Sequence, residues 1–137
     1  MKVSDYMTTD VVTANLLDGL RQTHVRMQER NIRHLPVLGD HGELVGIITD
    51  RDIRRPAFVD TNPDIAASYS IDDQHTVQQA MSGNPHTVSP GDDVTKALDE
   101  LLAKGYGALP VVKDGKLVGM LSAYDLLRAF KDHLTAG

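Results

Sequence analysis

Two short stretches of the sequence place a hydroxyl and a carboxylate three residues apart, directly after an apolar run that contains a glycine. The pairs are Thr49 with Asp52, and Ser122 with Asp125. A carboxylate can accept hydrogen bonds from both hydroxyls of a ribose. A hydroxyl beside the free amides of a helix start suits a phosphate or sugar oxygen. The same spacing is also that of a capping box, in which both side chains only secure the first turn of a helix.

The two stretches belong to an internal repeat that covers most of the chain. The repeat divides the chain into a first unit at 1–55, a linker at 56–76 and a second unit at 77–137. Identities continue on both sides of a short loop deletion, which chance similarity would not produce. The matching residues include Val3 and Val77, Met7 and Met81, Leu35-Pro36-Val37 and Leu109-Pro110-Val111, Gly46 and Gly119, and Arg55 and Arg128.

Each repeat is expected to form a short strand, an amphipathic helix, a hairpin and a closing helix. Residues 11–13 and 86–88 are expected as the short strands. In the second repeat, apolar residues at helical spacing run from Val94 to Leu102. Turn-rich loops predict hairpins over 35–49 and 109–122. The glycine within each hairpin strand indicates a close approach of another backbone.

The closing helices are expected to differ in length. Pro56 should end the first one near Arg55, because proline lacks an amide hydrogen and disfavours helix in its predecessor. We expect the linker to pack on the body or to carry a helical turn near 65–67. In the second repeat the closing helix should present an apolar face made by Leu126, Leu127, Phe130 and Leu134.

Composition narrows the class of protein. The chain has 137 residues, a net charge of −5 and no cysteine. Disulfides, thiolate metal sites and thiol catalysis are therefore excluded. The acidic balance disfavours nucleic-acid binding, no apolar run is long enough for a membrane span, and no secretory signal is visible. We expect a cytoplasmic protein.

Taken together, these features make the chain resemble a tandem pair of cystathionine-β-synthase-type (CBS) domains over 3–55 and 77–131. Four features appear in order in each repeat: a Val-x-x-x-Met start, a threonine at the first strand, a Leu-Pro-Val strand and a Gly-x-x-(Thr/Ser)-x-x-Asp turn. The resemblance implies an α/β (α+β) fold. Two β-α-β-β-α units would be related by a pseudo-twofold axis and packed through their sheets, with nucleotide clefts between them.

The resemblance also implies a ligand of the AMP, ADP or ATP class, with AMP favoured; S-adenosylmethionine or an NAD-type ligand is the alternative. Asp52 and Asp125 would hold ribose hydroxyls, with Thr49 and Ser122 beside them. The residues expected to line the two clefts are Val12, Thr13, Arg33, His34, Pro36, Thr49, Arg51, Asp52, His86, Thr87, Ala108, Pro110, Ser122, Tyr124 and Asp125.

The two clefts are expected to be unequal. The resemblance implies that the pair before Leu-Pro-Val contacts phosphate; this pair is Arg33-His34 in the first repeat but Gly107-Ala108 in the second. An arginine offers a permanently charged donor fork for phosphate oxygens, and a histidine adds a titratable one. The first cleft should therefore favour phosphorylated ligands.

Two classes of function remain open: a stand-alone regulatory module that signals to a partner protein in trans, and a structural dimerisation module without ligand. An enzyme is not expected, because the sequence has neither a P-loop nor a Gly-x-Ser-x-Gly nucleophile turn. The six histidines show no metal-ligand spacing. A homodimer is expected, since one module cannot bury all of its apolar helical faces.

Overall fold

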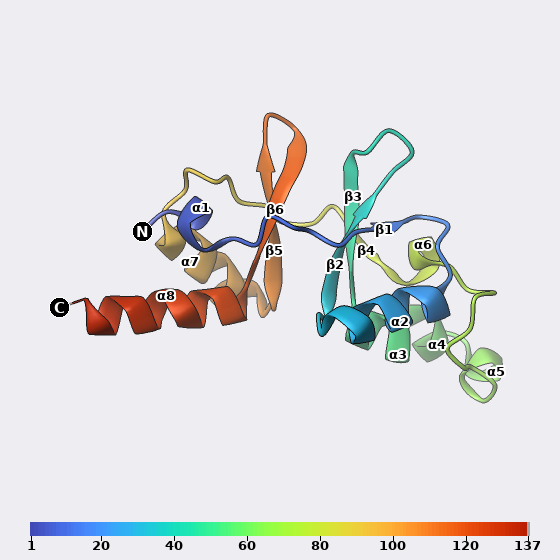
Figure 1. Cartoon of the computed structure of the whole chain (residues 1–137). Coiled ribbons are helices and arrows are strands. Elements are labelled where there is room, and N and C mark those ends of the chain that lie inside the picture. The colour runs from blue at the N-terminus through green and yellow to red at the C-terminus, as the bar shows by residue number, and fades with distance from the viewer. Residues whose placement is uncertain (137) are drawn as a thin grey trace. The chain divides into compact units, whose positions relative to one another are not determined.

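The computed structural model describes residues 1–136 and divides into two compact units. One consists of Val12–Asn84, and we call it the continuous unit. The other combines Met1–Val11 with the residues from Pro85 on, and we call it the split unit. Both have mixed α/β architecture (Figure 1).

The continuous unit is built on a four-stranded sheet with the order β1-β2-β3-β4. β1 runs parallel to β2, whereas β2, β3 and β4 follow one another in antiparallel pairs. The strands are β1 (Ala14–Asn15), β2 (His34–Leu38), β3 (Leu44–Thr49) and β4 (Ser82–Gly83), and the helices are α2 (Leu20–Arg30), α3 (Asp50–Arg54), α4 (Ala57–Asp60), α5 (Pro63–Ala66) and α6 (Val77–Ala80).

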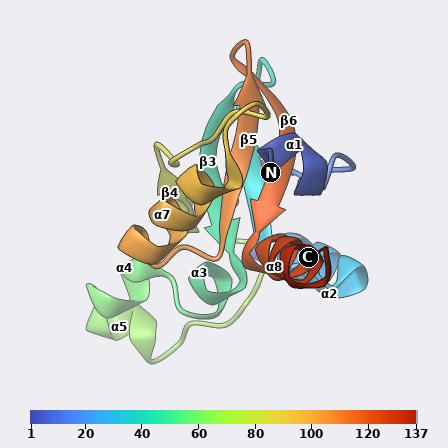
Figure 2. The same ribbon diagram turned by 90° about the vertical axis from the view of Figure 1, so that its left-hand side faces the viewer.

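The split unit is built on a single antiparallel hairpin. Its elements are α1 (Val3–Tyr6), α7 (Val94–Lys104), β5 (Ala108–Lys113), β6 (Lys116–Ser122) and α8 (Ala123–Thr135). Single bridges extend the hairpin on both edges, from Val88 to Val111 and from Thr8 to Met120. Helices α1, α7 and α8 surround the hairpin when the molecule is viewed from this side (Figure 2).

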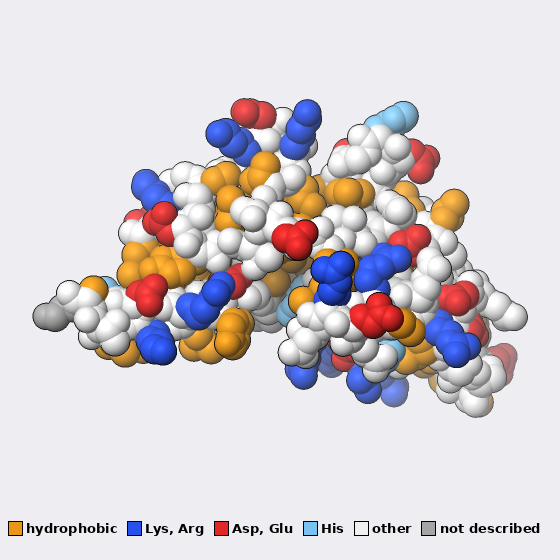
Figure 3. Space-filling model, viewed as in Figure 1, with side chains coloured by type: hydrophobic (Ala, Val, Ile, Leu, Met, Phe, Trp, Pro, Cys, Tyr) orange, Lys and Arg blue, Asp and Glu red, His pale blue; other side chains and the backbone are white. Residues whose placement is uncertain are grey.

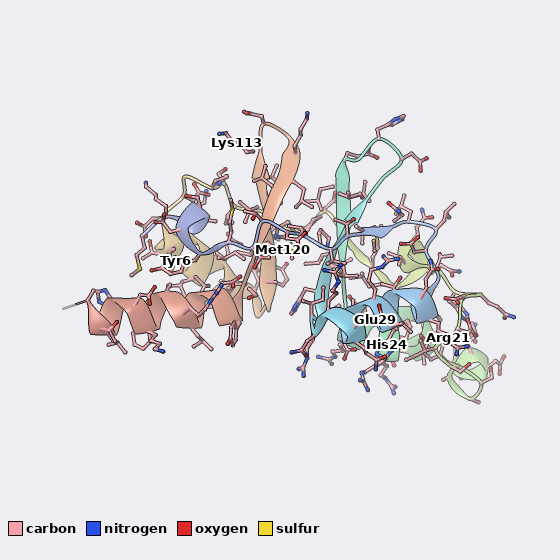
Figure 4. All side chains as sticks on the ribbon, in the orientation of Figure 1. Tyr6, Arg21, His24, Glu29, Lys113 and Met120 are labelled. Carbon is pink, nitrogen blue, oxygen red and sulfur yellow. The ribbon has the colours of Figure 1, made fainter. Side chains whose placement is uncertain are left out.

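The two repeats exchange their first segments. β4, from the start of the second repeat, pairs with β3 of the continuous unit. Conversely, Thr8 of the first repeat exchanges two backbone hydrogen bonds with Met120 of β6, at 2.8 and 2.9 Å. Figure 4 labels Met120 on this hairpin. The sequence repeat and the compact units therefore divide the chain at different places.

Glycines allow these exchanged segments to approach. A Cβ atom on Gly46 would lie 2.7 Å from the carbonyl oxygen of Ser82. A Cβ atom on Gly119 would lie 2.9 Å from the carbonyl oxygen of Thr8. Both distances are too short for real side chains, so the close backbone approach predicted from the strand glycines is confirmed.

Each unit has its own aliphatic core. In the continuous unit, fully buried side chains include Leu20, Met27, Leu35, Ile48 and Ile53. In the split unit, the buried cluster includes Val3, Leu101, Leu109, Leu121 and Leu126. These cores fix the hairpins and the helix starts that follow them.

Most of the expected elements are present, with two differences. Both hairpins form, α3 ends at Arg54 just before Pro56, and the linker carries helix α5. The strand expected at 11–13 instead lies at Ala14–Asn15. The side chain of Arg26 donates a hydrogen bond of 2.8 Å to the Thr13 carbonyl, which is therefore bound by a side chain and not by a neighbouring strand. The strand expected at 86–88 is reduced to the single bridge at Val88.

Candidate functional site

In the continuous unit, the turn from β3 into α3 forms a complete capping box. The amide of Asp52 donates to Thr49 Oγ1 at 3.1 Å, and the amide of Thr49 donates to Asp52 Oδ2 at 2.9 Å. Among residues 1–136, no hydrogen bond reaches Asp52 Oδ1. The half-buried carboxylate therefore secures the helix with one oxygen and leaves the other without a hydrogen-bond partner among the described residues.

The start of β2 lies beside this turn. His34 is paired with Thr49 in the antiparallel register, and the amide of Asp50 donates to the Arg33 carbonyl at 2.9 Å. Burial holds the pKa of His34 below its ordinary value, the Asp52 carboxylate opposes this shift and the Arg33 cation adds to it. Thus the strand pairing brings Arg33, His34, Thr49 and Asp52 together where β2 begins and β3 ends.

The other residues expected in this unit lie before β1, within β2 and on α3. Val12 and Thr13 immediately precede β1, whose first residue Ala14 pairs with Val37 beside the buried Pro36. Arg51 is exposed on the first turn of α3. All eight residues expected in the first repeat come from one compact unit.

In the split unit, the corresponding turn forms the same capping box but uses both carboxylate oxygens. The amide of Asp125 donates to Ser122 Oγ at 3.2 Å, and the amide of Ser122 donates to Asp125 Oδ2 at 2.9 Å. The guanidinium of Arg128 then donates to Asp125 Oδ1 at 2.5 Å. The side chain of Asp125 is only 6% exposed.

Sequence reasoning gave no role to Arg128, although the repeat aligned it with Arg55. Its guanidinium lies over the ring of Tyr124, 5.9 Å from the ring centre. An acid and an arginine three residues apart on a helix commonly pair, so the spacing was the available signal. Arg55 instead pairs with Asp60 of α4 at 2.8 Å.

The remaining residues expected to line a cleft in the second repeat lie further apart than those of the first. Ala108 is paired with Ser122 at the hairpin end, and Pro110 lies buried two residues further along β5. The exposed His86 has its ring directed at α7, with Nδ1 3.3 Å from an oxygen of Glu100. Its neighbour Thr87 is exposed.

These features define a pair of repeated α/β units, each with a capping-box turn at the end of a hairpin. The sequence matches the CBS domain family over residues 3–57 and 77–132. The chain therefore belongs to the CBS domain family and carries two such domains.

Solved structures and sequence relatives agree with this assignment. An uncharacterized 17.7 kDa protein of Acidianus ambivalens is 35% identical over 132 residues, which are 96% of this chain and 74% of that protein. The crystal structure of CBSX2 in complex with AMP superposes with a TM-score of 0.80 at 26% identity, covering 97% of this chain and 98% of that one. The CBS domain pair of protein MJ0100, in complex with 5′-methylthioadenosine and S-adenosyl-L-methionine, gives 0.79 at 25% identity with the same coverage.

Within residues 1–136, histidine and carboxylate side chains nowhere gather in a group of three that could hold a metal ion. No helix in this described part is long and apolar enough to cross a bilayer.

Proposed function

We propose that this chain is a regulatory module that binds an adenine nucleotide, with AMP as the first candidate, and signals to a partner protein in trans. The observation that carries the proposal is the free Oδ1 of Asp52, held beside Thr49, Arg33 and His34. The AMP complex of CBSX2 and the S-adenosyl-L-methionine complex of MJ0100 support this class of ligand.

Each residue has a role in this proposal. Asp52 Oδ1 accepts hydrogen bonds from the ribose hydroxyls, because an ionised carboxylate is an acceptor only. The exposed Arg33 and the half-buried His34 bind the phosphate as donors. Val12, Thr13 and Pro36 border the base, and the Arg51 side chain adds a second permanent positive charge.

We also propose that two copies pair through α7 and α8. Leu102, Leu127, Phe130 and Leu134 are 81, 65, 58 and 64% exposed. The two helices border an apolar groove of about 710 Å³ that includes Leu98 and Tyr106. Hydrophobic side chains gather along α8 in the space-filling view (Figure 3). This face matches a second copy of itself, because it is apolar along both helices.

A dimer also makes regulation in trans workable, since a nucleotide bound to one unit can change what the assembly presents to another protein. The proposed setting is the cytoplasm, where adenine nucleotides are available. A chain without cysteine needs no oxidising compartment. No chemical step is assigned to the chain in this proposal.

The proposal is tested by thermal unfolding and calorimetry with AMP, adenosine, ATP, NAD and S-adenosylmethionine. A ligand at about 100 times its dissociation constant should raise the free energy of unfolding by roughly 2.7 kcal/mol. Asp52→Asn keeps an oxygen for the Thr49 amide but replaces the free acceptor with a donor, so it should lose nucleotide binding and keep the fold.

Asp40→Asn, on the exposed hairpin loop of the same unit, is the matched control and should bind as the wild type does. If none of the five ligands stabilises the protein, the nucleotide-binding function is rejected. That outcome would leave the dimerisation module as the function of the chain.

A further inference from the structure

The two repeats carry the same aspartate and the same arginine but pair them differently. In the split unit, Asp125 and Arg128 bind each other at 2.5 Å. In the continuous unit, Asp52 and Arg55 occupy the matching positions, yet Arg55 pairs with Asp60 and leaves Asp52 Oδ1 without a partner among residues 1–136. Asp52 therefore has an oxygen available to a ligand, whereas both oxygens of Asp125 already accept hydrogen bonds.

The cause is the length of the helix that follows each turn. α8 continues to Thr135, so Asp125 and Arg128 lie one turn apart on a regular helix. α3 ends at Arg54, and Arg55 has left the helical conformation with φ −142° and ψ 78°. Pro56 follows and forces this ending. The side chain of Arg55 is thereby directed to α4, away from Asp52.

Further contacts hold the occupied pair in place. The Arg128 guanidinium lies over the Tyr124 ring, a favourable cation–π arrangement. Asp125 is nearly buried, with 6% of its side chain exposed, while 55% of the Arg128 side chain is exposed. Arg128 therefore covers the carboxylate from the solvent side. At the position of Tyr124 the continuous unit has Arg51, which offers no ring.

We infer that Arg128 closes the split unit to the ribose of a nucleotide, so that each chain binds one nucleotide, at Asp52 of the continuous unit. This inference rests on the proposed nucleotide binding. A ribose hydroxyl would have to compete at Asp125 Oδ1 with a charge-assisted hydrogen bond, which is about twice as strong as a neutral one. Arg128 is thus a residue that determines which site is occupied.

A phosphate-binding role for Arg128 predicts the opposite effect of its removal on nucleotide binding in the split unit. If its guanidinium bound the phosphate of a ligand in the split unit, removing it would weaken binding there. If it closes the site, removing it opens a new one. The number of AMP molecules bound per chain separates these roles.

The experiment is calorimetric titration of the full chain with AMP. The wild type should bind one AMP per chain and Arg128→Leu should bind two, with the new site gaining at least about tenfold in affinity. The Asp52→Asn variant should bind none, and Asp52→Asn combined with Arg128→Leu should bind one. Arg55→Leu, at the repeat-equivalent position, is the control and should still bind one.

Arg128→Met is the second variant, since methionine keeps a long side chain for packing against Tyr124 but donates no hydrogen bond to Asp125. Two equal sites in the wild type, or one site in both Arg128 variants, would overturn the inference while leaving the nucleotide-binding function intact. Failure of every protein to bind AMP, adenosine, ATP, NAD or S-adenosylmethionine would overturn the function itself.

Discussion

At the scale of single residues, the capping box and the proposed ligand site share one carboxylate in the continuous unit. Asp52 uses Oδ2 to accept the Thr49 amide and keeps Oδ1 free among the described residues. A side chain fixed by such a bond loses little further freedom when a ligand arrives. The capping box therefore orients the proposed ribose acceptor before binding.

Arg33 is expected to distinguish AMP from adenosine. A charged hydrogen bond to phosphate contributes roughly 1.5–3 kcal/mol, so the preference of the wild type for AMP should fall by about tenfold or more in Arg33→Ala. Calorimetry with both ligands measures this ratio. Arg30→Ala, at the exposed end of α2, serves as the control. An unchanged ratio in Arg33→Ala would exclude Arg33 as a phosphate ligand.

His34 should make stability depend on pH. Burial lowers its pKa in the folded protein below the ordinary 6.5. As the pH falls below 6.5, the unfolded chain takes up this proton first, so the free energy of unfolding should decrease until the folded pKa is passed. Denaturant unfolding between pH 5 and 8 measures this loss.

His34→Gln should lose that part of the dependence. His41→Gln, on the exposed hairpin loop, should follow the wild-type curve. Identical curves for His34→Gln and the wild type would show that His34 does not titrate as its buried position requires.

At the scale of elements, the glycines of β3 and β6 decide whether the exchanged segments can pair. Gly46→Ala and Gly119→Ala would each place a methyl group against a backbone carbonyl that cannot move freely. Each substitution should lower the free energy of unfolding by about 1–3 kcal/mol. Gly91→Ala is the matched control, since a Cβ there meets nothing within 4 Å. Equal stability of all three variants would contradict the observed close approach.

Sequence patterns predict the elements well where local chemistry decides them. The turn-rich loops specified both hairpins, the Thr49–Asp52 spacing specified a capping box, and Pro56 specified the end of α3. The strand expected at 86–88 is reduced to a single bridge at Val88. The strand expected at 11–13 was misplaced because the Thr13 carbonyl is bound by the distant Arg26 side chain. No local pattern encodes such a contact.

The exchange of segments could not be read from the repeat. Met7 and Met81 are equivalent in sequence, and so are Gly46 and Gly119. Either methionine segment would fit either glycine, so the alignment does not show which segment pairs with which hairpin strand. The occupied Asp125 was missed for a related reason: the alignment equates Arg55 with Arg128, although the helices that carry them end at different points.

At the scale of the whole molecule, the two units present different helical surfaces. α7 and α8 expose leucines and Phe130. α2 instead carries Arg21, His24 and Glu29, which Figure 4 labels on that helix. A twofold interface brings the same patch of both copies together. The proposed pairing of α7 and α8 with their own copies would bury the apolar surface without burying the charges of α2.

The proposed dimer is tested by light scattering at micromolar concentration. Phe130→Glu should shift the mass from dimer to monomer, because two carboxylates would be brought together in an apolar contact. Leu17→Glu is the control, since Leu17 is 78% exposed in the continuous unit and should leave the mass unchanged. A wild-type monomer, or a dimer that tolerates Phe130→Glu, would contradict the assigned surface.

The unit boundaries predict which fragment is independent. Residues 12–84 contain a complete sheet and a closed aliphatic core. This fragment should unfold cooperatively by circular dichroism. A fragment of residues 1–76 lacks β4 and should be less stable or unfolded. Equal stability of the two fragments would show that β4 is dispensable.

The exchanged first segment also sets an order of events during synthesis. Residues 1–11 leave the ribosome before Val12–Asn84, but Thr8 finds its backbone partner only when Met120 has been made. The intervening Val12–Asn84 is complete long before that point, and domains fold as units while the chain grows. Residues 1–11 are therefore made before the continuous unit but reach their native contacts after it, and Val3, buried in the finished protein, stays exposed until then.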